Sequence, residues 1–235
     1  MRRESLSAAR RSRPRIEQLT IFRRGAKRRG AGRNPKGEKA LVAHTQRESF
    51  SNHEPVHVTT RLRAGLSSLR QRAELAVVSD ALAAATDRFG FRVVHFSVQS
   101  NHLHPIVEAE HAHALGRGMK GLLVRIARAH NRLWKRSGSV FGDRYHTVVL
   151  RTLRQVRNAL VYVLNNARKH GIFDVDHHDP CSSGDWFDGW IERRCARIEA
   201  GDARSAPVWG RPRSWLLRRG WRKHGLIRTH ELPRS

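Results

Sequence analysis

Alternating and helical patterns of apolar residues follow one another along the middle of the chain. Val56–Leu62 alternates and is rich in β-branched residues, which predicts a strand. Apolar residues recur at a helical period within Ser67–Phe89, so a helix is expected there. Phe91–Val98 and Asn101–Glu108 then predict an antiparallel pair of strands joined by a short turn.

The second half of this region repeats the alternation of helix and strand. Leu115–Arg136 predicts an amphipathic helix, Thr147–Leu150 a short strand, and Leu153–His170 a third helix. The polar side of the second helix carries cations and no acid: Lys120, Arg125, Arg128, Arg132 and Lys135. A face of this composition favours contact with DNA over simple solvation.

The order of the elements predicts the fold class. Strand, helix, strand, strand, helix and strand, followed by one more helix, indicate an α+β protein with a ferredoxin-like (βαββαβ) palm and an antiparallel sheet. In that arrangement the first and third strands are central, and the two connecting helices cover one face of the sheet. The last helix is then free to pack on the other face.

Composition divides the chain into three parts. Residues 1–54 form a basic arm, with 15 Lys or Arg against 4 Glu in the first 50 residues, and glycine between them. Residues 55–172 hold the folded domain. Residues 173–235 form an extension that contains five of the six tryptophans and many arginines, and therefore predict a small lobe. Its aromatic and cationic residues suit base stacking, and they equally suit the attachment of that lobe to the palm.

The net charge of +26, from 46 Lys and Arg against 20 Asp and Glu, makes nucleic acid the expected partner. A membrane surface is a weaker alternative, because no basic amphipathic helix stands apart from the fold. No apolar run is long enough to span a bilayer, and the basic N-terminus lacks the apolar core of a signal peptide. Cys181 and Cys195 are the only cysteines, which fits a cytoplasmic protein. Their spacing from His177 and His178 matches no strong zinc pattern.

The basic arm allows two interpretations. Arginines of the glycine-containing stretch Gly25–Gly37, such as Arg29 and Arg33, can read the narrow minor groove of A·T-rich DNA. The same composition also describes a disordered tail that binds phosphates without specificity. We favour the second interpretation, and in both cases Arg29 and Arg33 are candidate DNA-binding residues.

A candidate metal site lies in the third predicted strand. The motif Asn101-His102-Leu103-His104 places two histidines two residues apart, so both project from one face while Leu103 turns into the core. Two neutral imidazoles are ligands for a divalent metal, and an incomplete ligand set leaves positions for a substrate oxygen. The alternative is chance, because the chain contains 15 histidines.

A candidate nucleophile lies in the third predicted helix. The chain has two tyrosines, Tyr145 and Tyr162. On a helix, Tyr162 shares a polar stripe with Asn158 and Asn166. A phenol can attack phosphorus to form a phosphotyrosine, and Asn166 could add an oxygen ligand for the metal. The alternative is an ordinary buried aromatic residue with a satisfied hydroxyl.

Three motifs in this order resemble the HUH single-tyrosine transposases, and in particular the REP-associated tyrosine transposases: Asn101–His104, Val140–His146 and Tyr162–Asn166. The likeness covers about residues 56–171 and is weaker in the tail. It implies a palm-like fold in which His102 and His104 match the metal ligands, Tyr162 the nucleophile, and Asn166 a polar residue that helps hold the metal. Tyr145 is then structural. The chain departs from the pattern at Pro105, which removes a ladder donor within the metal-binding strand, and at Ala167, where many relatives have proline.

The resemblance implies a metal-dependent transposase or endonuclease that cleaves single-stranded or hairpin DNA. Mg²⁺ or Mn²⁺ held by His102, His104 and Asn166 would bind the scissile phosphate, and Tyr162 would form a 5′-phosphotyrosine and release a 3′-hydroxyl. Arg125, Arg128 and Arg132 would bind the DNA backbone. The protein would act as a monomer or homodimer.

Other classes remain alternatives to this reading. They are a non-catalytic nucleic-acid-binding protein on an RRM-like sheet, an inactivated transposase copy, and a zinc-dependent hydrolase that would recruit His57 or Glu108.

Overall fold

One antiparallel sheet organises the part of the chain that the computed structural model describes, residues 48–85, 87–169, 178–192 and 210–233. Its strands are β1 (Val56–Arg61), β2 (Phe91–Val98), β3 (His102–Ala109) and β4 (His146–Val149). They lie in the order β2-β3-β1-β4. The first and third strands are therefore central, as predicted, and the protein is an α+β protein.

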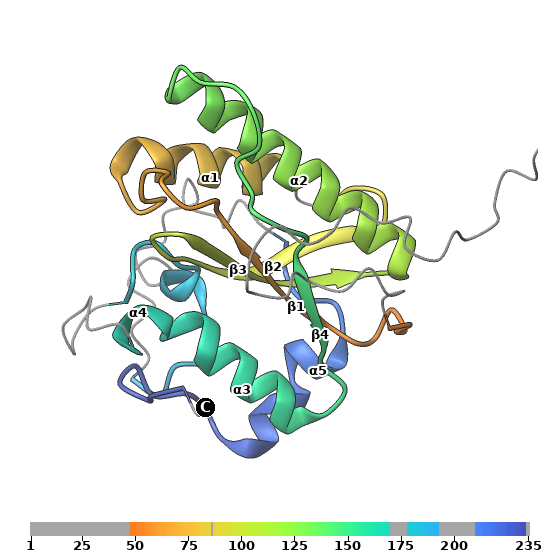
Figure 1. Cartoon of the computed structure of the whole chain (residues 1–235). Coiled ribbons are helices and arrows are strands. Elements are labelled where there is room, and N and C mark those ends of the chain that lie inside the picture. Colours follow the sequence, from red (N-terminus) through yellow and green to blue (C-terminus); the bar gives the residue numbers. More distant parts are fainter. Residues whose placement is uncertain (1–47, 86, 170–177, 193–209, 234–235) are drawn as a thin grey trace, which may run out of the picture. The chain divides into compact units, whose positions relative to one another are not determined.

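Helices cover both faces of this sheet (Figure 1). On one face lie α1 (Arg72–Ala84) and α2 (Ala112–Leu133), and on the other lies α3 (Leu153–Leu164), which is followed by α4 (Asn166–Lys169). The C-terminal segments add three short elements, η1 (Gly184–Trp186), α5 (Trp215–Arg218) and η3 (Gly220–His224). Among the described residues, no helix is both long and apolar enough to cross a bilayer.

The alternation of side chains along the central strands separates two cores. Val58 and Leu103 belong to the core that faces α1 and α2, whereas Ile106 belongs to the core under α3. Because neighbouring residues on a strand point to opposite faces, His57, His102 and His104 lie on the α3 side. The predicted placement of the histidine pair, on the face not covered by the connecting helices, is confirmed.

Pro105 does not interrupt the strand that carries the histidines. β3 is continuous from His102 to Ala109, and its pairing with β1 keeps one register on both sides of Pro105, from Arg61 opposite His102 to Val56 opposite Val107. A proline lacks the N–H group that a ladder needs, and the pairing of β3 with β2 shifts by one residue between Val93 and His95, beside Pro105. The residues around Pro105 remain buried and paired on both sides.

The first two helices differ from the sequence prediction at their N-terminal ends. α1 begins at Arg72, five residues later than expected, because the Arg70 guanidinium is bound in a loop. It donates to both carboxylate oxygens of Asp179, at 2.8 and 2.7 Å, and to the carbonyl of Val98 at 2.9 Å. The bonds to the Asp179 carboxylate raise the pKa of Arg70. α2 begins earlier than expected because the ring of His111 accepts a capping bond from the Ala114 N–H group at 3.1 Å.

The C-terminal segments share the core under α3. Phe187, Trp190 and Trp221 are buried there with Leu160 of α3, and their rings contact one another. Each indole N–H donates to a carbonyl, that of Trp190 to Gly184 at 2.8 Å and that of Trp221 to Leu217 at 3.0 Å. For these two tryptophans the structure therefore favours the packing role over base stacking. Trp209 lies outside the described residues.

A buried histidine gives this core a measurable pH dependence. His95 lies on β2 against Phe187, 3.3 Å from the Ser183 hydroxyl, and burial lowers its pKa to about 4. Between about pH 6.5 and pH 4 the unfolded chain binds a proton that the folded chain does not. The contribution of His95 to stability is therefore complete above about pH 6.5 and is lost as the pH falls towards 4.

We expect His95→Gln to flatten the loss of stability between pH 6.5 and pH 4 by up to roughly 3 kcal/mol. The measurement is the free energy of unfolding in urea at a series of pH values. The quantity compared between variants is the slope of this free energy against pH. The exposed His53 supplies the matched control, His53→Gln, which should leave the slope unchanged. An unaltered slope in His95→Gln would contradict the assignment.

Candidate active site

The two histidines of β3 form the floor of the candidate site. The rings of His102 and His104 stack with centroids 5.7 Å apart and planes inclined by 19°. His104 is buried and His102 is half-buried, while Leu103 between them is buried in the other core. The Nδ1 atom of His104 lies 3.3 Å from the Thr59 hydroxyl of β1, so a neighbouring strand fixes its orientation.

A third histidine joins this pair from β1. The ring of His57 stacks on that of His104 with centroids 5.8 Å apart. Burial, with a smaller contribution from His146, lowers the pKa of His57 to about 4, so the ring is neutral near pH 7. Its Nε2 atom is buried and has no hydrogen-bond partner in the part of the chain that the structure describes. Sequence reasoning named His57 only for the hydrolase alternative, although the alternation of its strand already placed it on the polar face.

Tyr162 of α3 lies directly against these rings. Its centroid is 5.4 Å from that of His104 and 5.6 Å from that of His57, both in edge-on contacts. The helix buries Leu160, Val163 and Leu164 in the core, which turns the half-buried tyrosine towards the sheet. Tyr145 is buried in the opposite core, as expected for a structural residue. The structure thus brings the candidate nucleophile to the candidate metal ligands.

Asn166 follows a break in the helix that the sequence did not predict. The expected helix from Leu153 to His170 ends at Leu164, and α4 starts at Asn166. Asn165 makes the break: its side-chain amide donates to the carbonyls of Arg228 at 3.1 Å and Glu231 at 2.9 Å. The amide of Asn166 is buried, and neither of its polar atoms has a hydrogen-bond partner among the described residues.

Two imidazoles, those of His102 and His104, and the amide of Asn166 form a ligand set that suits a divalent metal. A buried amide oxygen without a partner is costly unless something else binds it, so Asn166 has the character of a ligand residue. The described residues contain no group of three or more His, Cys, Asp or Glu arranged to hold a metal. A mixed set that includes an amide is compatible with that finding.

Three of the predicted DNA-binding arginines, those of α2, are not near this site. Arg125, Arg128 and Arg132 are exposed on α2, which covers the opposite face of the sheet from Tyr162 (Figure 1). Arg29 and Arg33 lie outside the described residues. A cation that sequence reasoning missed is Arg61, an exposed residue paired with His102 across β1 and β3. Directly paired residues point to the same face, so Arg61 lies beside the histidines.

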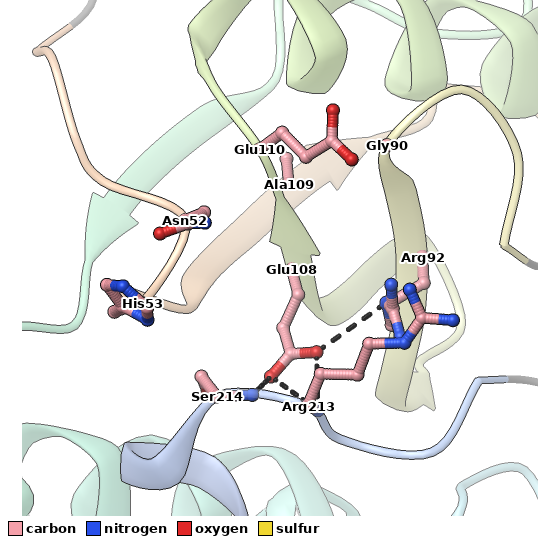
Figure 2. A pocket seen from close by; sticks show the side chains of 9 residues that line it. All are labelled: Asn52, His53, Gly90, Arg92, Glu108, Ala109, Glu110, Arg213 and Ser214. Carbon is pink, nitrogen blue, oxygen red and sulfur yellow. Dashed lines mark hydrogen bonds and ion pairs between the residues drawn. The ribbon is translucent and has the colours of Figure 1, made fainter.

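Glu108, the acidic ligand considered for a hydrolase, has a different role (Figure 2). It lies four residues beyond His104 on β3, about 13 Å away along the strand. Its carboxylate accepts the backbone N–H groups of Arg213 and Ser214, each at 2.8 Å, and lies 3.6 Å from the Arg92 side chain. Glu108 therefore attaches the C-terminal segment to the sheet and is not a ligand beside His102 and His104.

The bonds of Asn165 predict a specific loss of stability. Asn165→Ala removes two hydrogen bonds and leaves the carbonyls of Arg228 and Glu231 without their partner, so we expect a loss of about 1–3 kcal/mol in the free energy of unfolding. Urea denaturation measures it. The exposed Asn158 on the same helix provides the control, and Asn158→Ala should change stability by less than about 0.5 kcal/mol. Equal effects of the two substitutions would refute a special role for Asn165.

Comparison with known proteins adds a structural likeness. No protein-family model and no curated protein matches the chain. Among solved structures, the fold is similar to "Structure of the REP associates tyrosine transposase bound to a REP hairpin", with a TM-score of 0.51 and 16% identity. The match covers 74% of this chain and 93% of the other. The likeness shows that the two proteins share a fold, in agreement with the family that the sequence motifs resemble.

Proposed function

We propose that this protein is a DNA-processing enzyme that cleaves and rejoins single-stranded DNA through Tyr162. The observation that carries the proposal is the contact of the Tyr162 ring with His104 and His57, two residues from different strands. A tyrosine placed only for packing would not need imidazoles around it. A phenol beside metal-binding groups is the arrangement that covalent phosphoryl transfer requires.

The reaction follows from these groups. Tyr162 Oη attacks the scissile phosphorus, and the bond from phosphorus to the 3′ oxygen breaks. The products are a 5′-phosphotyrosine and a free 3′-hydroxyl, while the phenolic proton passes to solvent and the departing oxygen takes one up. Attack by a second 3′-hydroxyl on the phosphotyrosine reverses the step and joins strands. Because the bond energy is kept in the phosphotyrosine, no nucleotide cofactor is needed.

The metal requirement belongs to the same proposal. His102, His104 and Asn166 would hold Mg²⁺ or Mn²⁺, which would neutralise charge on the phosphoryl oxygens. Thr59 keeps His104 oriented, and the low pKa of His57 keeps that ring from adding a positive charge that would repel the metal. Arg61 is placed to bind a phosphate next to the scissile one. The arginines of α2 can bind only DNA that passes to the other side of the sheet.

Three further observations support DNA as the substrate. The net charge of +26 attracts polyanions. The strand order β2-β3-β1-β4 is compatible with the palm of the proposed enzyme class, and the similar solved structure is described as bound to a REP hairpin. The proposed substrate is therefore a single strand next to a hairpin.

Two alternatives differ in how well the structure supports them. A non-catalytic RRM-like protein would need a sheet face that is open for stacked bases. In this protein α3 covers the face that α1 and α2 leave uncovered. A zinc-dependent hydrolase would need His57 as a third protein ligand, but the described residues contain no group of three His, Cys, Asp or Glu arranged to hold a metal. In such a hydrolase water would attack the phosphorus in place of Tyr162.

Covalent trapping separates these mechanisms. The substrate is a DNA hairpin with a single-stranded extension, labelled at either its 5′ or its 3′ end and incubated with Mn²⁺. We expect only the label on the 3′ side of the cut to stay attached to the protein, as a band that survives denaturing electrophoresis. Tyr162→Phe should abolish this adduct, and Tyr145→Phe should retain it because Tyr145 lies in the other core. Cleavage that persists in Tyr162→Phe without an adduct would establish hydrolysis. Absence of cleavage by the intact chain would leave a binding protein or an inactive copy.

The metal ligands are testable without activity. Saturating Mn²⁺, at about 100 times its Kd, should stabilise the folded chain by about 2.7 kcal/mol and raise Tm by roughly 5 °C or more. His104→Gln and Asn166→Ala should each remove most of this shift, since both lie in the proposed ligand set. His53→Gln serves as the control and should keep it. A shift of equal size in all four proteins would place the metal elsewhere.

A further inference from the structure

The described part of the C-terminal region presents one exposed tryptophan within a cluster of cations. Trp215 begins α5 and is 53% exposed, unlike the buried Trp190 and Trp221. We call the Trp215 patch the group formed by Arg213, Trp215, Arg218, Arg219 and Lys223, all of which are exposed. Four of them, all but Lys223, line a hollow of about 280 Å³.

The patch is held rigidly by the sheet and by α3. The Glu108 carboxylate binds the backbone just before Trp215, as Figure 2 shows for Arg213 and Ser214. The Ser214 side chain then caps α5 by accepting from the Leu217 N–H group at 3.4 Å. Gly220 lies so close to the indole that an added Cβ would be only 2.8 Å from it. The ring is therefore fixed in place while about half of its surface stays open.

The cations of the patch are available for a ligand. Within the described residues, the side chains of Arg218 and Arg219 form no ion pair. Arg213 pairs with the exposed Asp87 at 2.6 Å, yet its side chain remains 67% exposed. The Lys223 ammonium lies 5.4 Å from the centre of the Trp215 ring, above the indole. A half-exposed indole bordered by the guanidinium groups of Arg218 and Arg219 matches the alternation of bases and phosphates in single-stranded DNA.

We propose that the Trp215 patch is a second DNA-binding site, at which a base of a single strand stacks on Trp215 and Arg218 and Arg219 bind the adjacent phosphates. This proposal rests on the proposed function for its choice of single-stranded DNA as the ligand. The patch adjoins the start of α3, because Gly220 also contacts Leu153. Tyr162 lies nine residues further along that helix, about 14 Å away. One strand can thus extend from the nucleophile to the patch within a few nucleotides.

The stacking part of the proposal is tested with the full chain and a fluorescently labelled oligo(dT) strand, with Kd measured by anisotropy. We expect Trp215→Ala to weaken binding about tenfold and Trp215→Phe to stay within about threefold of the natural chain. On an abasic strand of the same length, which keeps the phosphates and lacks the bases, Trp215→Ala should have no effect. The exposed Phe89 supplies the aromatic control, and Phe89→Ala should bind normally.

The phosphate part is tested by the salt dependence of the same binding. Replacing Arg218 and Arg219 together by Gln should reduce the slope of log K against log salt by about 1.4, because about 0.7 counterion is released per phosphate on a single strand. The double substitution of the exposed Arg72 and Arg88 by Gln changes the net charge equally and should leave the slope unchanged. Trp215→Ala should also leave the slope unchanged.

Several outcomes would overturn this site. The first is unchanged affinity of Trp215→Ala and Trp215→Phe for oligo(dT), in variants whose circular dichroism and Tm show that they are folded. The second is a loss of affinity in Trp215→Ala that is equally large on the abasic strand, or a loss equally large in Phe89→Ala. The third is an equal salt slope in the two double variants. These results would indicate that the patch attracts any polyanion, such as an acidic protein, through its charge alone. The adduct test with Tyr162→Phe is independent, so the patch can fail while the nuclease stands, and the nuclease can fail while the patch stands.

Discussion

The packing of α3 across a histidine-bearing sheet face is the constraint on which the rest of the site depends. The helix buries Val156, Leu160 and Val163 without exposure to solvent, which provides the apolar contact that holds it on the sheet. The same contact covers His57 and His104, and it leaves Asn166 with an amide to which none of the described residues bonds. Unpartnered polar groups of this kind typically cost about 1–3 kcal/mol each. An apolar face would be more stable, so these groups point to a role other than stability.

The C-terminal segments make that packing possible. α1 and α2 occupy the other face, so α3 would be exposed on its outer side without further cover. Phe187, Trp190 and Trp221 provide the cover, and Arg157 of α3 binds the carboxylate of Glu231 through two contacts of 2.6 and 2.9 Å. With Asn165 bound to the backbone of the same segment, the end of α3 is fixed from outside. The positions of Tyr162 and Asn166 therefore depend on residues some 60 positions later in the chain.

This dependence explains which features the sequence could predict. The order of strands and helices and the face of the histidines follow from local periodicity, and β1, β2, β3 and β4 lie within one residue of their predicted bounds. The break at Asn165 could not be predicted, because the carbonyls that it binds belong to Arg228 and Glu231. The start of α1 depends in the same way on Asp179. The missed role of His57 is different, since its alternation with Val56 and Val58 was visible in the sequence.

The arrangement of charge leads to a last step of synthesis. The predicted topology already implied that the cationic side of α2 and the tyrosine of α3 lie on opposite faces of the sheet, and the structure places them so (Figure 1). A single short strand bound at Tyr162 cannot also lie along α2, whereas Arg61 and the Trp215 patch are on the face of α3. If the substrate includes a hairpin, its duplex and its single strand can be held by different faces. Binding of the duplex to α2 and reaction of the strand at Tyr162 would then respond separately to substitutions on the two faces.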